Sequence, residues 1–235
     1  MERMEFKKWV QSRIKADLLP TLRERGFRKG RAGWYIRERG GVVQFLRFSL
    51  KASQVSLSGG SSPVFFPFAT LPYHGLALSG GDAMLCQNGI RVPVPVSGPP
   101  LVTPEAAEKW DRLAALIRER LLPELDQIHS LEELMSFPFL VPDNDNWNVL
   151  RWYVQGVYRC LSGDIPGGLS LLERARGCKR GYLDYLESID CSFSPKDDQT
   201  AAIFDSIDLL LAAGEEGFSS AFVQICGEAR AWYKV

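Results

Sequence analysis

The first clear pattern along the chain is an apolar repeat near its N-terminus. Apolar residues recur at every fourth position while lysines and arginines occupy the other faces, as in Phe6, Val10, Ile14, Leu18 and Leu22. This spacing predicts an amphipathic helix over residues 4–25. Gly26 follows as an expected left-handed cap, and Pro20 within the pattern is expected to kink the helix.

Beyond Trp34 the period changes to that of β-strands. The predicted strands are WYIRER, VVQFLRFSLK, QVSLS, AMLCQ and IRVPV, which span Trp34 to about Val96. The expected turns are Gly40-Gly41, Gly59-Gly60, Gly80-Gly81 and Asn88-Gly89. Short strands joined by tight turns predict an antiparallel sheet, with the first helix packed on it.

A second amphipathic helix follows a linker at residues 97–104. Thr103 is the expected N-cap and Pro104 the first helical residue. The apolar positions of this helix fall on one stripe, which consists of Trp110, Leu113, Ala114, Ile117 and Leu121. Pro123 is expected to end or kink the helix, which could return to close the sheet.

The remainder of the chain has helical periodicity. Two prolines and a polar cluster mark a boundary at 138–148, and helices are predicted over 147–161, 166–176, 181–190, 198–213 and 217–232. We therefore expect an α+β fold. Residues 1–140 form a domain with an antiparallel sheet and helices, and residues 141–235 form an all-helical domain.

One pair of these helices resembles a single tetratricopeptide hairpin. The residues that carry the resemblance are Gly156, Leu172 and Ala175, at compatible spacing. Gly168 replaces the small alanine usual in that family, and no second copy follows. Since a functional solenoid needs about three repeats, we expect a lone helical hairpin.

The N-terminal region is similar to a bacterial family of domains of unknown function. Its members follow a helix with a Gly-Phe-Lys-like turn, an aromatic strand and an antiparallel sheet. The matching residues, within about 5–137, are Leu18, Pro20, Leu22, Gly26, Phe27, Lys29, Trp34, Arg37 and Phe48. The resemblance implies a fold and no catalytic residues. Because small families of this kind often sit beside toxin genes, it raises an immunity role by analogy.

Composition and charge narrow the class of protein. The 235 residues are 46% hydrophobic, 24% charged and 11% aromatic, which excludes a wholly disordered, collagen-like or membrane-embedded chain. The net charge of zero is unevenly distributed. Residues 1–100 hold 15 Lys and Arg against 6 Asp and Glu, whereas residues 101–235 hold 13 against 22. This asymmetry indicates partner surfaces, or two halves that attract each other.

The expected location is the cytoplasm. The five cysteines, Cys86, Cys160, Cys178, Cys191 and Cys226, include no CxxC pair, which fits reduced thiols. The sequence MERMEFKKWV lacks the apolar run of a secretory signal, and no stretch has the length of a membrane span.

Candidate catalytic residues are few. No GxSxG, HExxH, P-loop or strand-linked GxGxxG motif is present, and the only histidines are His74 and His129. His74 is a candidate general base but fits a loop better, and Cys178 is a candidate reactive thiol because basic residues flank it. The run from Asp143 to Asn146 fits a turn better than a cation site. We expect no catalytic residue, metal or cofactor.

Two charged segments are candidate binding surfaces. Arg28, Lys29 and Arg31, followed by Trp34 and Tyr35, could contact phosphates and stack on bases, or could solvate a helix end beside core aromatics. Residues 181–217 contain nine acidic residues against one basic residue, Lys196. The predicted partner-binding carboxylates in this segment are Asp197, Asp198, Asp205, Asp208, Glu215 and Glu216.

These patterns predict a non-enzymatic protein-binding module. The specific hypothesis is a bacterial immunity protein that neutralises a cognate toxin, such as a nuclease, through the acidic helices. Trp147, Trp152 and Trp232 are candidate aromatic anchors, with core packing as the alternative for each. The other hypotheses are a nucleic-acid-associated regulator that uses the basic N-terminal region, and an enzyme with a site near His74 or Cys178.

Overall fold

The chain folds into two compact units. The computed structural model describes residues 3–30, 33–51, 54–65, 74–78, 83–84, 104–136, 148–181 and 198–233. The first unit comprises Met1–Pro63, Ala69–Leu140 and Tyr233–Val235, and the second comprises Val64–Phe68 and Val141–Trp232. Residues 64–68, which the sequence analysis placed with the sheet, therefore belong to the unit that contains the C-terminal helices.

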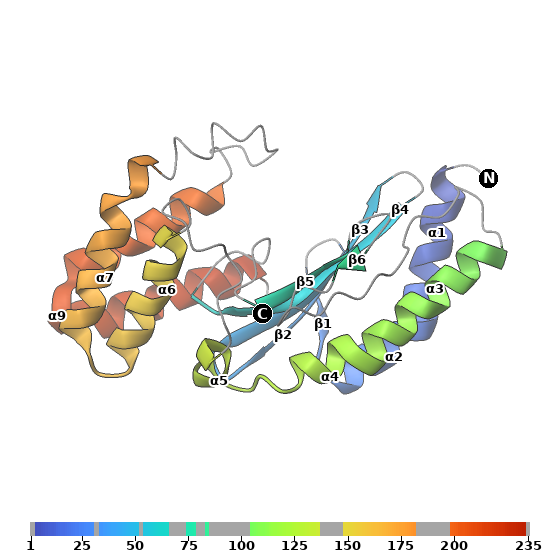
Figure 1. Ribbon diagram of the computed structural model, residues 1–235, viewed down its shortest axis with the longest axis horizontal. Helices are drawn as coiled ribbons and strands as arrows, with labels where there is room; N and C mark the ends of the chain where they lie inside the picture. The colour runs from blue at the N-terminus through green and yellow to red at the C-terminus, as the bar shows by residue number, and fades with distance from the viewer. Residues whose placement is uncertain are drawn as a thin grey trace. The chain divides into compact units, whose positions relative to one another are not determined.

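The first unit contains a six-stranded antiparallel sheet, which confirms the predicted α+β class. The strands are β1 (Arg28–Lys29), β2 (Trp34–Arg39), β3 (Val42–Lys51), β4 (Gln54–Pro63), β5 (His74–Leu78) and β6 (Ala83–Met84). They lie in chain order across the sheet, so each strand pairs with its neighbour in sequence (Figure 1). The predicted strands at Trp34 and Val42 have the bounds of β2 and β3.

The β2–β3 connection is a two-residue hairpin at Gly40-Gly41, as predicted. Arg39 pairs with Val42, and both glycines have positive φ, of 52° and 78°. Tight hairpins need such angles to match the twist of their strands. A Cβ atom on Gly40 would lie only 2.1 Å from the carbonyl oxygen of His129. Glycine is therefore required at position 40 for two reasons: its φ is positive, and a larger residue would collide with the backbone of His129.

The turn predicted at Gly59-Gly60 is wrong, because both glycines lie inside β4. Gly59 pairs with Leu46 and Gly60 with Phe45. A Cβ atom on Gly59 would lie 3.1 Å from the carbonyl oxygen of Phe45 and 3.4 Å from a methyl carbon of Leu121. Glycine in a strand interior often marks such a close approach, and here it admits a helix onto the sheet.

The structure also adds strands that the periodicity did not predict. His74, expected in a loop, is the first residue of β5 and pairs with Ser61. Arg28 and Lys29 form the short edge strand β1, opposite Ile36 and Tyr35. The predicted strand at IRVPV, the later glycine turns and the 97–103 linker lie outside the described residues.

The predicted N-terminal helix is present and contains a π-helical turn. It consists of α1 (Arg3–Arg13), the π-helix η1 (Ile14–Leu18) and α2 (Leu19–Glu24), and Pro20 lies two residues after the end of η1. The Leu19 N–H donates to the carbonyl of Ile14, five residues back. This wider turn relieves the collision that a proline ring makes with the preceding turn of an α-helix. Gly26, with φ of 82°, caps the helix as predicted.

The second long helix repeats this construction. It consists of α3 (Pro104–Leu116), the π-helix η2 (Ile117–Leu121) and α4 (Leu122–Leu125), and Pro123 follows η2 at the same distance. The two sequences, IKADLLPTL from Ile14 and IRERLLPEL from Ile117, share the pattern I-(K/R)-x-x-L-L-P-x-L. The same nine-residue motif therefore produces the same π-turn twice.

The two motif-bearing helices run side by side on one face of the sheet (Figure 1). Their direction is parallel, since Arg13 pairs with Asp111 and, further along both helices, Arg25 pairs with Asp126. The core between helices and sheet includes Ile14, Leu18, Leu22, Leu113, Ile117, Leu121, Leu46, Phe48 and Leu57. Burial of each such side chain contributes about 1.5–3 kcal/mol relative to exposure. The predicted apolar stripe from Trp110 is buried throughout.

A short helix, α5 (Leu131–Ser136), ends the described part of this region. Ser130 and Glu133 form a capping box at its start. The Glu133 N–H donates to the Ser130 hydroxyl at 3.1 Å, and the Glu133 carboxylate accepts from the backbone N–H groups of His129 and Ser130.

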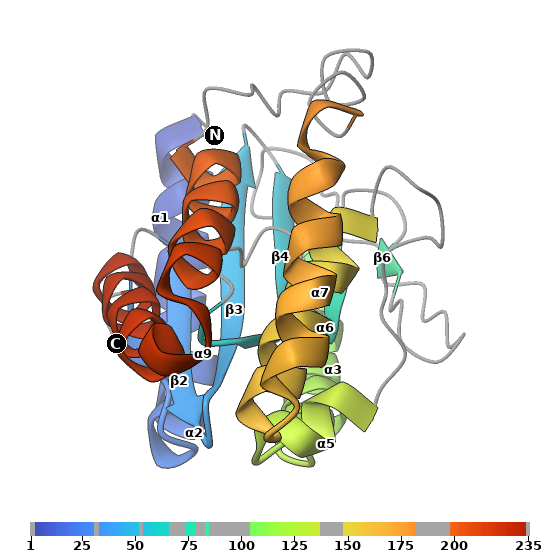
Figure 2. The ribbon, with the colours of Figure 1, turned by 90° about the vertical axis from the view of Figure 1, so that its left-hand side faces the viewer.

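The second unit contains the predicted helical hairpin. Helices α6 (Asn148–Leu161) and α7 (Ile165–Gly177) lie side by side, and Asp164 caps α7 by accepting from Gly167 (Figure 2). A Cβ atom on Gly168 would lie 2.2 Å from Cys160 Sγ and 2.5 Å from the Gly156 carbonyl oxygen. The paired glycines therefore allow the two backbones to approach closely.

The final helix, α9 (Asp198–Tyr233), bends at Gly214, where φ is 61° and ψ is −160° (Figure 2). This break confirms the predicted division between helices at 198–213 and 217–232. Phe65 packs edge-on against Tyr153 and against Phe222 of α9, and the Tyr153 hydroxyl donates to the Phe65 carbonyl at 3.0 Å. These contacts explain why residues 64–65 belong to the helical unit.

Candidate functional site

The most connected polar group in the first unit lies at the ends of α2 and α4. It begins with Arg37 of β2 and Gln44 of β3, which are paired across the sheet and almost fully buried. Arg37 Nε donates to Gln44 Oε1 at 2.5 Å. Both side chains lie on the sheet face that the helices cover, where the neighbouring positions are apolar.

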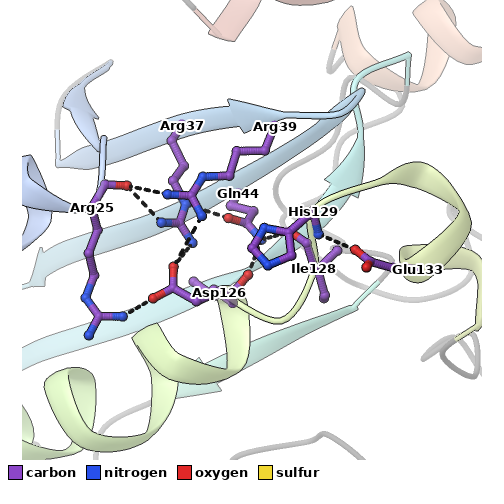
Figure 3. Close-up of polar contacts among 9 residues, drawn as sticks. Arg25, Arg37, Arg39, Gln44, Asp126, Ile128, His129 and Glu133 are labelled. Atoms are coloured by element: carbon purple, nitrogen blue, oxygen red, sulfur yellow. Dashed lines mark hydrogen bonds and ion pairs between the residues drawn. The ribbon is translucent and has the colours of Figure 1, made fainter.

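Three arginine side chains surround one carboxylate at this point (Figure 3). Arg37 Nη2 lies 2.6 Å and Arg39 Nη1 3.6 Å from Asp126 Oδ1, while Arg25 pairs with Oδ2. We call Arg25, Arg37, Arg39, Gln44 and Asp126 the arginine cluster. It carries three formal positive charges and one negative charge.

The arginine cluster also satisfies backbone carbonyls at the helix ends. The carbonyl of Arg25 accepts from Arg37 Nη1 at 2.8 Å and from Arg39 Nη2 at 3.2 Å. Gln44 Nε2 donates to the carbonyls of Leu125 and Ile128 (Figure 3). The last carbonyls of a helix lack partners within the helix, so these bonds attach both helices to the sheet.

Burial lowers the pKa of Arg37, and its hydrogen bond and ion pair with Asp126 oppose that shift. Its guanidinium also lies 4.4 Å from the ring centroid of Phe27. Every nitrogen of Arg37 therefore has a neighbour of favourable charge. We interpret the arginine cluster as a structural network of hydrogen bonds and ion pairs that holds the two helices on the sheet. Arg37 and Gln44 occupy strand positions that face the core, where the alternating pattern predicts apolar residues. These two polar residues at apolar positions are the sequence signal that could have identified the cluster.

In the second unit, four of the predicted acidic residues of α9 are on the surface. Asp205, Asp208, Glu215 and Glu216 are all exposed. Within the described part of the chain, none of the four makes an ion pair or hydrogen bond. Asp198 is the first residue of α9, and Asp197 lies outside the described residues.

The bend at Gly214 divides these carboxylates into two pairs. Asp205 and Asp208 are three residues apart and share one face of the first segment. Glu215 and Glu216 begin the segment after Gly214, where the positive end of the helix dipole favours acidic side chains. Asp205 and Asp208 have no comparable structural explanation.

The structure also reveals a basic surface that the sequence analysis did not assign. Arg174, Arg176, Lys179 and Arg180 are exposed at the C-terminal end of α7 and just after it. Arg174 lies over the ring of Trp152 at 4.5 Å, and Arg176 pairs with Glu173 at 2.5 Å. Arg176, Lys179 and Arg180 were singled out in the sequence only as neighbours of Cys178, and Arg174 was not singled out.

The predicted N-terminal basic surface is only partly described. Arg28 and Lys29 are exposed on β1, and Arg31 lies outside the described residues. Trp34 and Tyr35 are 7% and 9% exposed, and Arg47 covers the Trp34 ring at 5.3 Å. The two aromatics therefore face the core and form no open stacking platform.

The candidate reactive residues lie on different elements of the chain. His74 is in β5, His129 is exposed between α4 and α5, and Cys178 is half-buried after α7. Burial, with the nearby carboxylate of Asp164, raises the pKa of Cys160 to about 11, so its thiol stays protonated at neutral pH. Among the candidate anchors, Trp152 and Trp232 are half-buried, whereas Trp147 and the Asp143–Asn146 run lie outside the described residues.

The described residues contain no metal-binding cluster and no membrane-spanning helix. No group of three or more His, Cys, Asp and Glu residues within the described ranges could hold a metal ion. No helix in the same ranges combines the length and apolar character needed to cross a bilayer. Comparison of the chain with family models, curated proteins and solved structures finds no match.

Proposed function

We propose that the protein is a non-enzymatic binding module that recognises a basic face of another protein through α9. Four exposed carboxylates that have no partner among the described residues carry this proposal: Asp205, Asp208, Glu215 and Glu216. Free surface charges of one sign attract an oppositely charged protein at long range and accelerate its association.

The shape of the acidic surface favours a protein partner. Its charges project from a helix, so a folded partner can approach them without entering a cavity. Val223, in the segment of α9 after Gly214, is 68% exposed and offers an apolar contact on the same helix. An interface with an apolar contact and a charged rim has the usual composition of protein–protein recognition.

The specific partner that we propose is a toxin encoded beside this protein, such as a nuclease. A nuclease active site is basic because it holds phosphate groups, so a helix bearing carboxylates can occupy it by charge resemblance. The family resemblance of the N-terminal region supports the same role by analogy.

Co-expression tests this function. The chain would be expressed in a bacterial host together with each protein encoded beside its gene, and growth and complex formation would be measured. We expect one neighbour to be toxic alone and harmless with this chain, and the two proteins to elute together from a size-exclusion column. The double variant Asp205→Lys/Asp208→Lys should lose both effects.

The matched control is Glu24→Lys/Glu119→Lys, which makes the same change in net charge at exposed positions of the first unit. It should protect as well as the unaltered chain. Protection by the α9 variant, or binding of single-stranded DNA that depends on Arg28 and Lys29, would overturn the proposal. The second result would favour the nucleic-acid hypothesis.

A further inference from the structure

Opposite charges lie on neighbouring elements of the helical unit. Residues 148–181 contain six basic residues against two acidic ones, whereas α9 contains six acidic residues against one basic one. Division of the chain into halves hides this contrast, because both elements fall in its C-terminal half. Positive and negative charge are therefore separated between two elements within the helical unit itself.

The two charged surfaces adjoin each other at one contact. Lys179 Nζ lies 5.0 Å from the centroid of the Phe204 ring, and Phe204 precedes Asp205 in α9. No ion pair in the described part of the chain joins Lys179 or Arg180 to Asp205 or Asp208. Cations and carboxylates on these two elements thus lie close together without pairing with each other in the described part of the chain.

This arrangement distinguishes between two kinds of partner. A nucleic acid attracted to Arg174, Lys179 and Arg180 would carry its phosphates close to the carboxylates of α9, where like charges repel it. A partner with both signs of charge avoids this conflict. A second copy of the chain has both surfaces, at the same separation.

We propose that the protein forms a two-fold symmetric dimer in which the basic end of α7 in each copy contacts the acidic first segment of α9 in the other. The basic surface is Lys179 and Arg180, and the acidic surface is Asp205 and Asp208. A two-fold axis brings each surface against its complement twice, because residues related by such an axis exchange contacts reciprocally.

The second copy and the proposed toxin would compete for Asp205 and Asp208, so the dimer is tested with the purified chain alone, in the absence of any toxin. Mass would be measured by size-exclusion chromatography with light scattering at about 0.05 M and about 0.5 M salt. Screening between exposed charges is much stronger at the higher concentration. We expect a dimer at low salt and a monomer at high salt.

Charge exchange identifies the contacting surfaces. Lys179→Glu/Arg180→Glu makes both surfaces acidic, and Asp205→Lys/Asp208→Lys makes both basic. Each variant alone should be monomeric, with a dimer dissociation constant raised at least about tenfold, because like charges then oppose each other across the interface. An equal mixture of the two should form a heterodimer, since both contacts are then attractive.

The quadruple variant, with both surfaces reversed in one chain, should dimerise again, and Glu24→Lys/Glu119→Lys should leave dimerisation unchanged. Circular dichroism spectra that match those of the unaltered chain would verify that the variants fold. A monomer at low salt, a salt-independent dimer, or failure of the two variants to combine would overturn the proposal. So would binding of an RNA oligonucleotide to a monomer that the α7 variant abolishes.

Discussion

The two units use charged side chains in opposite ways. In the first unit, Arg37 is 3% exposed and its guanidinium contacts Asp126, Gln44 and a backbone carbonyl. In the second unit, Asp205 and Asp208 are exposed and have no such partner among the described residues. Arg37 is thus part of the interior of the first unit, whereas Asp205 and Asp208 are part of the surface of the second.

The difference shows which charges are informative about function. Removal of a buried charge from its partner is costly, so the arginine cluster is explained by the stability of the fold. Exposed charges contribute little to stability, so their accumulation on one helix calls for another explanation. This contrast leads to four predictions, ordered by expected size.

Substitution Asp126→Ala should have the largest effect. It leaves the buried Arg37 guanidinium without its carboxylate and beside two further arginines, so we expect a loss of about 3–5 kcal/mol in the free energy of unfolding. Urea unfolding measures this value. The matched control, Glu173→Ala, removes a carboxylate from the exposed Arg176 and should cost no more than about 1 kcal/mol. Equal losses in the two variants would contradict the comparison.

Substitution Gly168→Ala should separate α6 from α7. The added methyl group would collide with Cys160 Sγ and the Gly156 carbonyl, so we expect a loss of about 1–3 kcal/mol. Gly177→Ala, in the same helix, places a methyl group in open space and should raise stability by up to about 1 kcal/mol. Thermal denaturation of both variants tests the opposite signs.

Alkaline pH should weaken the interior of the helical unit. The pKa of the Cys160 thiol is raised from 9.0 to about 11 in the fold, so the unfolded chain loses this proton first as pH rises. Stability should therefore decline above pH 9, by about 1 kcal/mol at pH 10 from this group. Burial also raises the pKa of Tyr153 in the same unit and of Tyr233 in the sheet unit, which adds to the decline. Urea midpoints at pH 8 and pH 10 would show it, and a flat profile would refute it.

Neutralisation of the acidic surface should have the smallest effect on the fold. Asp205→Asn/Asp208→Asn removes two exposed charges that stabilise no described neighbour, so the free energy of unfolding should change by no more than about 0.5 kcal/mol per site. Dimerisation at low salt should nevertheless weaken. Stability and association measured on the same preparation would separate the two roles, and a large loss of stability would mean that these carboxylates serve the fold.

Local patterns in the sequence were sufficient for most elements near the two long helices. Val10, Ile14, Leu18 and Leu22 are all buried, as their four-residue spacing predicts. The turns at Gly26 and Gly40-Gly41 and the break at Gly214 were also predictable, because each follows from the local freedom of glycine. The exposed acids of α9 were predicted from composition alone.

Contacts between distant segments were not predictable in the same way. Gly59 has the sequence signature of a turn, and only the approach of Leu121 explains its place in a strand. The arginine cluster joins residues of β2 and β3 to Asp126, far along the chain, and no local period encodes that meeting. The repeated π-turn motif differs, since comparison of the chain with itself would have found it.

Each unit contains a short segment that lies far along the chain from the rest of that unit, and this has a consequence for folding during synthesis. Phe65 belongs to the core of helices that begin at Asn148, and Tyr233 belongs to the unit whose sheet begins at Arg28. Because a nascent chain emerges N-terminus first, Phe65 is made well before the helices that bury it. Tyr233 likewise reaches the sheet unit only after all the described helices have been translated. Neither unit can therefore finish folding on the ribosome ahead of the other, and the two should acquire protease resistance together.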